Sequence, residues 1–269
     1  MSSFYAYDFT FDDISSRDFD LKIITFDDGS LFEGVGSASV KIFSQKVMRK
    51  SKPYFLGVSQ EPVLEFPITI GCEDPISGIQ RDLISKWLFG RAEYKKFQIM
   101  QDDLLGAYFY CFLNDPEPLY IGGLNYAFTC NVVCDSPFAY KYPKTVSGSY
   151  VSKAQETFSI YNDSSEDNYL YPEINFKIST SGSAFSLVNA NDNNRAFQFG
   201  LNAEGALLGD EEIGVNNDLQ IIESSTGLRR LSKFNKNWLR FVPGINEITV
   251  TADIDWFQIA YTERMKIGG

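Results

Sequence analysis

The chain has 269 residues, of which 44% are hydrophobic and 15% aromatic, and its formal net charge is −11 at pH 7. The apolar content and a charged fraction of 22% exclude a disordered chain, and the length allows two ordinary domains or one large β domain. The acidic balance disfavours nucleic acid and anionic membranes as partners, while the absence of histidine excludes histidine-based catalytic triads and histidine-ligated zinc.

The first twenty residues carry neither the basic region nor the apolar region of a signal peptide. No run approaches the roughly 20 apolar residues that a membrane helix needs. We therefore expect the protein to be made in the cytoplasm, with its four cysteines as reduced thiols. Cys130 and Cys134 fall on one face of an alternating strand, about 13 Å apart, which is too far to share a zinc ion. Buried thiols and no metal site are expected.

The first half of the chain alternates with period two, which is typical of strands. Candidate strands are Leu21–Phe26, Ser39–Phe43, Val63–Gly71, Lys95–Gln101, Gly106–Leu113 and Tyr126–Cys134. Pro67 places its strand at a sheet edge, because proline cannot donate to the hydrogen-bond ladder. The run Asn114–Pro118, with prolines at 116 and 118, predicts a turn or loop.

A glycine-containing stretch follows the first predicted strand, and a basic cluster begins within the second and extends toward the third. Asp27 to Ser39 predicts a flexible loop, whose composition suits ordering on contact. Five basic residues follow within twelve positions, with Tyr54 and Phe55 behind them: Lys41, Lys46, Arg49, Lys50 and Lys52. A solvated hairpin tip is the favoured interpretation of this cluster. The alternative is a basic loop that touches an acidic neighbouring subunit or passing nucleic acid.

The only convincing helical pattern spans Ser77 to Arg91. Ser77 followed by Gln80 is typical of a capping box, and Gly90 fits a left-handed residue that ends a helix. One apolar stripe runs along it: Ile76, Ile79, Leu83, Ile84, Trp87 and Leu88. The pattern predicts an amphipathic helix packed on a sheet.

The pattern changes near Tyr140, and the second half contains short runs between turn signals. We predict an N-terminal β domain over residues 1–140, a linker over 141–152 and a C-terminal β-sandwich or jelly roll over 153–269. Its candidate strands are Thr157–Tyr161, Pro172–Ile178, Phe185–Val188, Ala196–Phe199, Leu219–Ile222, Glu247–Thr251 and Trp256–Tyr261. Asn189–Asn194 and Gly209–Asn217 are predicted turns.

Two alternative functions use residues of this second half. A carbohydrate-binding module would use Trp238 and Trp256 as stacking platforms, although we expect both to pack in the core. A glycosidase would need a pair of carboxylates, for which Asp253 and Asp255 beside Trp256 are the most suggestive set. Their position near a strand end is more typical of a solvated turn. We therefore expect no enzyme activity, no catalytic residues and no cofactor.

The order of these features resembles the distal tail proteins of long-tailed, siphovirus-type phages. The residues that carry the resemblance lie along nearly the whole chain: Phe9–Phe19, Glu65–Ile70, the helix ending in Trp87-Leu88 with the strand Tyr94–Met100, Asn125–Tyr140, Tyr171–Phe176 and Pro243–Val250. Asn125–Tyr140, which closes on Pro-Phe-Ala-Tyr, is the strongest match.

The resemblance implies an N-terminal β domain that forms a hexameric ring and a galectin-like C-terminal sandwich that points outward. Such a ring is a structural hub, which joins the tail tube to the adsorption apparatus and lets DNA pass. The implied partners are further copies of the chain, the tail tube protein and tail-associated or receptor-binding proteins. The implied location is the virion tail tip, after assembly in the host cytoplasm. Binding of host cell-wall glycan by the sandwich is the alternative.

Overall fold

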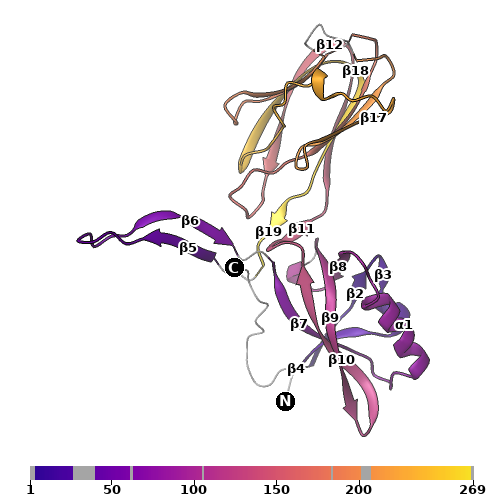
Figure 1. Ribbon diagram of the computed structural model, residues 1–269. Coiled ribbons are helices and arrows are strands. Elements are labelled where there is room, and N and C mark those ends of the chain that lie inside the picture. Colours follow the sequence, from indigo (N-terminus) through magenta and orange to yellow (C-terminus); the bar gives the residue numbers. More distant parts are fainter. Residues whose placement is uncertain are drawn as a thin grey trace. The chain divides into compact units, whose positions relative to one another are not determined.

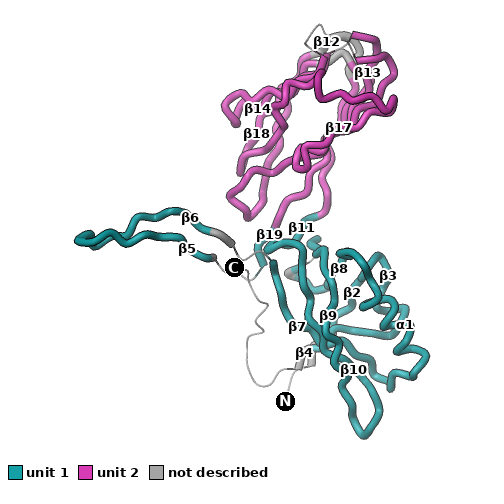
Figure 2. Tube along the Cα trace, in the orientation of Figure 1, with its two compact units in different colours: residues 1–141, 265–269 teal, residues 142–264 magenta. Residues whose placement is uncertain are grey.

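The computed structural model describes residues 4–26, 40–60, 63–104, 106–182, 184–200 and 207–267. The chain separates into two compact units, Met1–Lys141 with Met265–Gly269 and Tyr142–Arg264, which Figure 2 colours differently. Each unit has its own apolar core. The fold is mostly β, with one α-helix among the described residues, which confirms the predicted fold class (Figure 1).

The main sheet of unit 1 is antiparallel and follows the order β1-β4-β7-β10-β9-β8-β2-β3, with β11 paired to β9 and to β19. Its strands are β1 (Phe4–Tyr7), β2 (Phe9–Phe11), β3 (Ile14–Ser15), β4 (Lys22–Phe26), β7 (Glu65–Gly71), β8 (Lys95–Ile99), β9 (Ala107–Ile121), β10 (Leu124–Cys134), β11 (Ala139–Lys141) and β19 (Arg264–Met265). Two 3-10 helices, η1 (Ser16–Phe19) and η2 (Asp102–Leu104), connect them. The predicted strands of this half are therefore present, with shifted ends.

Trp87 of helix α1 (Gly78–Leu88) organises the core of unit 1. Its ring is parallel to that of Phe9, with centroids 5.9 Å apart, and stacks on Phe19 at 4.6 Å. Its indole Nε1 donates a 2.9 Å hydrogen bond to the carbonyl oxygen of Phe11. A buried indole N–H needs such a partner, so this bond fixes the helix against β2.

The helix begins as predicted but ends differently. The Ser77 hydroxyl accepts from the Gln80 N–H at 3.2 Å, whereas the Gln80 side chain donates to the carbonyl of Phe19 instead of completing a capping box. Gly90 is not left-handed, since the residues with positive φ do not include it. Its lack of a side chain matters because a Cβ there would lie 2.8 Å from the Lys86 carbonyl oxygen. Of the predicted apolar stripe, Ile79 is 80% exposed.

Two proline signals of unit 1 have outcomes that differ from the predictions. Pro67 does not lie in an edge strand as predicted, because β7 runs between β4 and β10. Its missing N–H is tolerated because β4 pairs with Ile70 and Gly71 of β7, beyond Pro67. The predicted turn at Asn114–Pro118 is wrong, because these residues lie inside β9. The register shifts there, and Asp115 has a φ of 53°, so the sequence signal marks a β-bulge.

Unit 2 is a sheet with the order β15-β14-β18-β13-β16-β17, in which β12 also pairs with β18. Its strands are β12 (Lys144–Asn162), β13 (Glu173–Ile178), β14 (Phe185–Asn189), β15 (Arg195–Phe199), β16 (Glu212–Asn216), β17 (Ile221–Ser224) and β18 (Gly244–Tyr261), and η3 (Leu231–Lys233) is a 3-10 helix. The first half of β18 pairs with β14 and its second half with β13. β18 therefore joins two parts of the sheet, which we call wings: β14 with β15, and β13 with β16 and β17.

Phenylalanine side chains from both wings meet in the core of unit 2. Phe176 of β13 lies 4.4 Å from Phe185 of β14 and 5.4 Å from Phe199 of β15, measured between ring centroids. All three rings are fully buried. Contacts between the inner faces of two sheet layers are what define a sandwich, as predicted.

Three predictions for the second half are wrong. Residues 141–152 are not an irregular linker, because β12 begins at Lys144 and pairs with β18. The predicted turn Gly209–Asn217 contains β16, whose glycine at 214 faces the Asn175 side chain. The two predicted strands at Glu247–Thr251 and Trp256–Tyr261 form the single strand β18. In addition, Ile267 packs in the core of unit 1, although the predicted C-terminal domain extended to residue 269.

Candidate assembly surface

Strands β5 (Val40–Gln45) and β6 (Tyr54–Gln60) form a two-stranded sheet of their own. We call this hairpin, residues 40–60, the arm. A register shift between Phe43 and Ser44 places a bulge in β6, next to Gly57 with a φ of 141°. Isolated two-stranded hairpins are marginally stable in water, so the arm is a segment that gains from a partner.

The apolar side chains of the arm are exposed. Met48 at its tip is 91% exposed, Phe55 is 68% exposed and Leu56 is 65% exposed. Further exposed apolar side chains of the arm are Ile42, Phe43, Val47, Tyr54 and Val58. Contiguous exposed apolar residues mark interaction sites on soluble proteins. The arm therefore has the composition of a binding surface.

The arm is also cationic, as the sequence indicated. Residues 40–60 supply five of the 24 basic residues and none of the 35 acidic ones. The ammonium of Lys41 lies 5.7 Å from the centre of the Phe43 ring, and that of Lys50 lies 4.8 Å from the Tyr54 ring and bonds its hydroxyl. The predicted exposed hairpin tip is confirmed. The preceding stretch Asp27–Ser39 lies outside the described residues.

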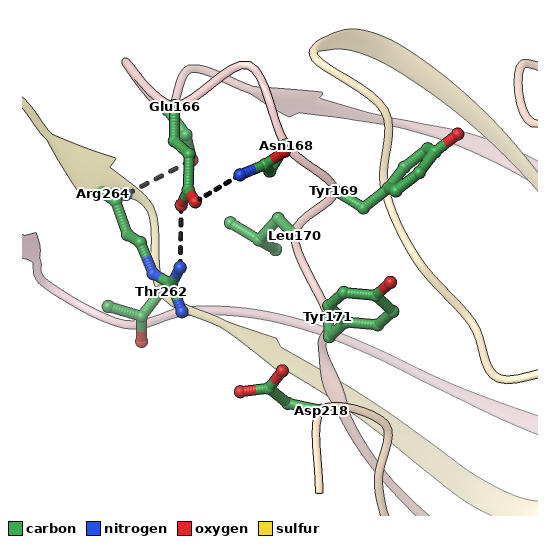
Figure 3. Close-up of a pocket in the computed structure, with 9 residues that line it drawn as sticks. Glu166, Asn168, Tyr169, Leu170, Tyr171, Asp218, Thr262 and Arg264 are labelled. Atoms are coloured by element: carbon green, nitrogen blue, oxygen red, sulfur yellow. Dashed lines mark hydrogen bonds and ion pairs between the residues drawn. The ribbon is translucent and has the colours of Figure 1, made fainter. Parts of the chain in front are cut away.

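A cavity of about 290 Å³ lies in unit 2 (Figure 3). The Glu166 carboxylate accepts from Arg264 at 2.7 Å and from Asn168 at 2.9 Å, so its charge is already compensated (Figure 3). The Arg240 guanidinium covers the Tyr169 ring at 3.6 Å. Asp218 is the second carboxylate of the lining. Glu166, Asn168 and Arg264 therefore bind one another at the wall of the cavity.

The residues of the alternative functions do not gather at this cavity. Trp238 is half-buried and packs against Phe234, with ring centroids 4.8 Å apart. Trp256 is half-buried in β18, and neither tryptophan lines the cavity. Asp255 is 3.3 Å from the ammonium of Lys177, and the Asp253 side chain lies outside the described part of the chain. Trp238 therefore packs against the core as expected, whereas Trp256 is not among the described side chains of the unit 2 core.

The cysteines behave as core thiols in unit 1. Cys111, Cys130 and Cys134 are buried, with Cys134 opposite Cys111 in the β9–β10 pairing, which confirms the prediction. Burial raises the pKa of Cys130 and of Cys134 to about 12, and it also raises the pKa of Cys111. Cys72 is only half-buried. No group of three or more potential metal ligands occurs within the described ranges.

A buried ion pair in unit 2 escaped the sequence analysis. The Arg230 guanidinium donates to both oxygens of the Glu211 carboxylate, at 2.6 and 2.7 Å. Burial by itself would raise the pKa of Glu211, but the bonds from Arg230, from the Ser224 hydroxyl and from the Leu208 N–H together lower it. The two residues are 19 positions apart, a separation that no local pattern reveals.

Comparisons with known proteins fit this arrangement of two β units. Residues 4–136 match a family model described as a phage tail protein N-terminal domain, and residues 138–261 match one described as a phage tail C-terminal domain. The chain belongs to this family of phage tail proteins. No curated protein sequence matches it. The boundary between the two family models falls close to the division between the two units.

Two solved structures share the fold of this tail protein. The Dit protein of phage SPP1, titled a paradigm of hub adsorption apparatus in Gram-positive infecting phages, is 12% identical, with a TM-score of 0.67 over 97% of this chain and 99% of that one. A chain of the phage p2 baseplate in its activated conformation is 8% identical, with a TM-score of 0.51 over 96% of this chain and 97% of that one. Among the described residues, no helix is long and apolar enough to cross a membrane.

Proposed function

We propose that this tail protein is a structural hub whose copies close into a ring, six to the ring, at the distal end of the tail. The ring connects the tail tube to the adsorption apparatus and leaves a central passage for DNA. The observation that carries the proposal is the arm, a hairpin whose apolar side chains are exposed in the part of the chain that the structure describes. Its activity is assembly, and catalysis plays no part in it.

The physical argument starts from the arm. A subunit that projects an apolar hairpin gains stability when a neighbour buries that hairpin. In this proposal the arm binds a different surface of its neighbour, so the contact is head-to-tail. Repeated head-to-tail contacts give a ring when the rotation closes, and a filament otherwise. The fold shared with a protein titled a hub favours the ring.

The two units have separate roles in this proposal. Unit 1, which includes the arm, builds the ring, and unit 2 is the sandwich that carries contacts to tail-associated or receptor-binding proteins. The tail tube protein binds one face of the ring, and the adsorption apparatus lies on the other. The exposed helix residues Ile79 and Leu83 add apolar surface to unit 1 for such contacts. The protein thus belongs to the virion tail tip, after assembly in the host cytoplasm.

The test compares the wild-type chain with a variant in which residues 41–59 are replaced by a short Gly-Ser turn. Multi-angle light scattering gives the mass of each, and electron microscopy of the same fractions shows its shape. We expect closed rings for the wild type and single folded chains for the variant. A wild type that stays monomeric at every concentration and salt tested would refute the proposal.

A further inference from the structure

Unit 1 contains a groove of about 1010 Å³ at one end of its main sheet. The pairing register places Lys22 of β4, Gly71 of β7, Ala127 of β10 and Leu119 of β9 side by side across four strands. A glycine is needed at position 71, because a Cβ there would lie 2.7 Å from the Cβ of Ala127. This side-by-side order of strands can be followed in Figure 1.

The floor of the groove is apolar and its rim is acidic. Leu21, Ile24, Leu119 and Ile121 supply apolar surface, and Ile121 is largely exposed. The acidic side chains of the lining are Asp8, Asp20, Glu73 and Asp74, and the basic ones are Arg17 and Lys22. Arg17 is already paired with Asp8, since its Nε donates to that carboxylate at 2.7 Å. The remaining rim therefore carries a net negative charge.

The carboxylates of Asp20, Glu73 and Asp74 are available to a partner. All three are exposed, and no ion pair holds any of them among the described residues. A groove with an apolar floor and an unneutralised acidic rim suits a segment that is apolar and basic at once. Residues 40–60, with five basic residues and no acidic one, are such a segment.

We propose that the acidic groove of one subunit receives the arm of the next subunit in the ring. The apolar side chains of the arm cover the groove floor, and the lysines and arginine at its tip face Asp20, Glu73 and Asp74. No arm residue that the structure describes lines the groove, and the apolar side chains of the arm are exposed. The opposite charges of the two surfaces make a second copy of the chain the occupant. This inference rests on the proposed self-assembly and names its two contacting surfaces.

A disulfide cross-link tests the contact directly. Cys72 lines the groove and is the only one of the four cysteines that is not buried, while Met48 sits exposed at the arm tip. Burial, with smaller contributions from the carboxylates of Asp20 and Asp74, raises the pKa of Cys72, so oxidation is carried out at alkaline pH. Assembled Met48→Cys protein should give a ladder of covalent multimers on non-reducing gels.

Two controls define the outcomes of this experiment. Met48→Cys/Cys72→Ser and Leu228→Cys, the latter on the exposed surface of unit 2, should give no ladder. A cross-linked monomer of changed mobility would place the arm in its own groove and overturn the inference. If the Met48→Cys protein forms normal rings but no cross-link to Cys72, the groove is not the receiving site. The proposed ring would stand in that case. A wild type that never assembles would instead refute the proposed function.

Charge reversal provides a second, independent test. We expect Lys46→Glu/Lys52→Glu to raise the concentration for half-assembly about tenfold, and Glu73→Lys/Asp74→Lys to do the same, because each juxtaposes like charges. Combining all four substitutions in one chain should restore assembly. Arg229→Glu/Lys236→Glu, which changes the charge equally on unit 2, should leave assembly unchanged. An arm variant that assembles normally but loses retention of duplex DNA would assign the arm to nucleic acid and overturn the inference.

Discussion

The arm and the sandwich of unit 2 are built from the same kinds of residue and have opposite fates. Both are antiparallel strands that contain phenylalanine and β-branched side chains. Phe176 of the sandwich is fully buried among rings from other strands, whereas Phe55 of the arm is mostly exposed. The sandwich closes on itself within one chain. The apolar side chains of the arm remain exposed, and in the proposed assembly another chain covers them.

The same contrast applies to their charged groups. The Arg230–Glu211 pair of unit 2 is buried and joined by two hydrogen bonds. The arm lysines are exposed, and none of them forms an ion pair with a described acidic group. Lys41 and Lys50 lie over neighbouring aromatic rings. Charges in the sandwich therefore contribute to folding, while charges in the arm are free to steer association. Four predictions follow this division.

The largest effect is expected from removing a phenylalanine ring in the two regions. Phe176→Ala leaves a cavity between Phe185 and Phe199 and should lower the free energy of unfolding of unit 2 by about 3–5 kcal/mol. Phe55→Ala should change the stability of the single chain by less than about 0.5 kcal/mol. Urea unfolding followed by tryptophan fluorescence measures both. Equal losses in the two variants would remove the distinction between the regions.

The second prediction removes a cation from each region. Arg230→Met leaves the Glu211 carboxylate buried without its partner and should destabilise unit 2 by about 3 kcal/mol. Lys50→Met in the exposed arm should leave the unfolding of either unit unchanged. Thermal unfolding monitored by circular dichroism distinguishes the two. Unit 2 unaffected by Arg230→Met would mean that the pair contributes nothing to folding.

The third prediction concerns pH and has a definite sign. Because the folded-state pKa of Glu211 is lowered, its contribution to stability is complete above the unfolded value of about 4.3 and is lost as the pH falls through the folded pKa. Glu211→Gln should therefore flatten the acid limb of the stability profile of unit 2. Urea midpoints measured across the acidic range provide the profile. An acid limb of unchanged slope in Glu211→Gln would contradict the assignment.

The smallest effect is expected at a glycine of the arm. Gly57 has a φ of 141°, which side chains rarely adopt, so Gly57→Ala should strain the hairpin by about 1 kcal/mol although the added Cβ meets no atom within 4 Å. We expect weaker assembly, about fivefold in concentration, with unchanged unfolding of unit 2. Gly78→Ala, which also adds a Cβ in open space, is the matched control. Assembly that is equally strong in both variants would show that the arm's shape is irrelevant.

Much of the fold is predictable from local patterns. Alternation located most strands, the helical stripe located α1, and the basic cluster was correctly placed on a hairpin tip. Local patterns fail where pairing partners decide the outcome. Residues 144–152 look irregular by themselves, but β18 supplies the hydrogen bonds that make them a strand. Asn114–Pro118 reads as a turn, yet β10 accommodates it as a bulge.

The candidate site was only half predictable. The arm is continuous in sequence, and its charge and aromatic residues are visible there. The acidic groove is assembled from segments around residues 20–24, 71–74 and 119–127, which only the sheet register brings together. Likewise, the exposure of Ile79 cannot be predicted from the helical stripe, because the stripe does not show which of its side chains another element covers. A surface made from segments that are distant in sequence can be located only from the tertiary structure.

Sedimentation velocity of the wild type beside Phe55→Ala/Leu56→Ala, over a wide range of protein concentration, tests the central claim most directly. Both substitutions truncate exposed side chains of the arm and leave the cores of the two units untouched. If the arm joins the subunits, the wild type sediments as a closed multi-subunit species and the double variant as a single folded chain. Identical sedimentation of the two proteins, whether as monomers or as assemblies, would contradict the account.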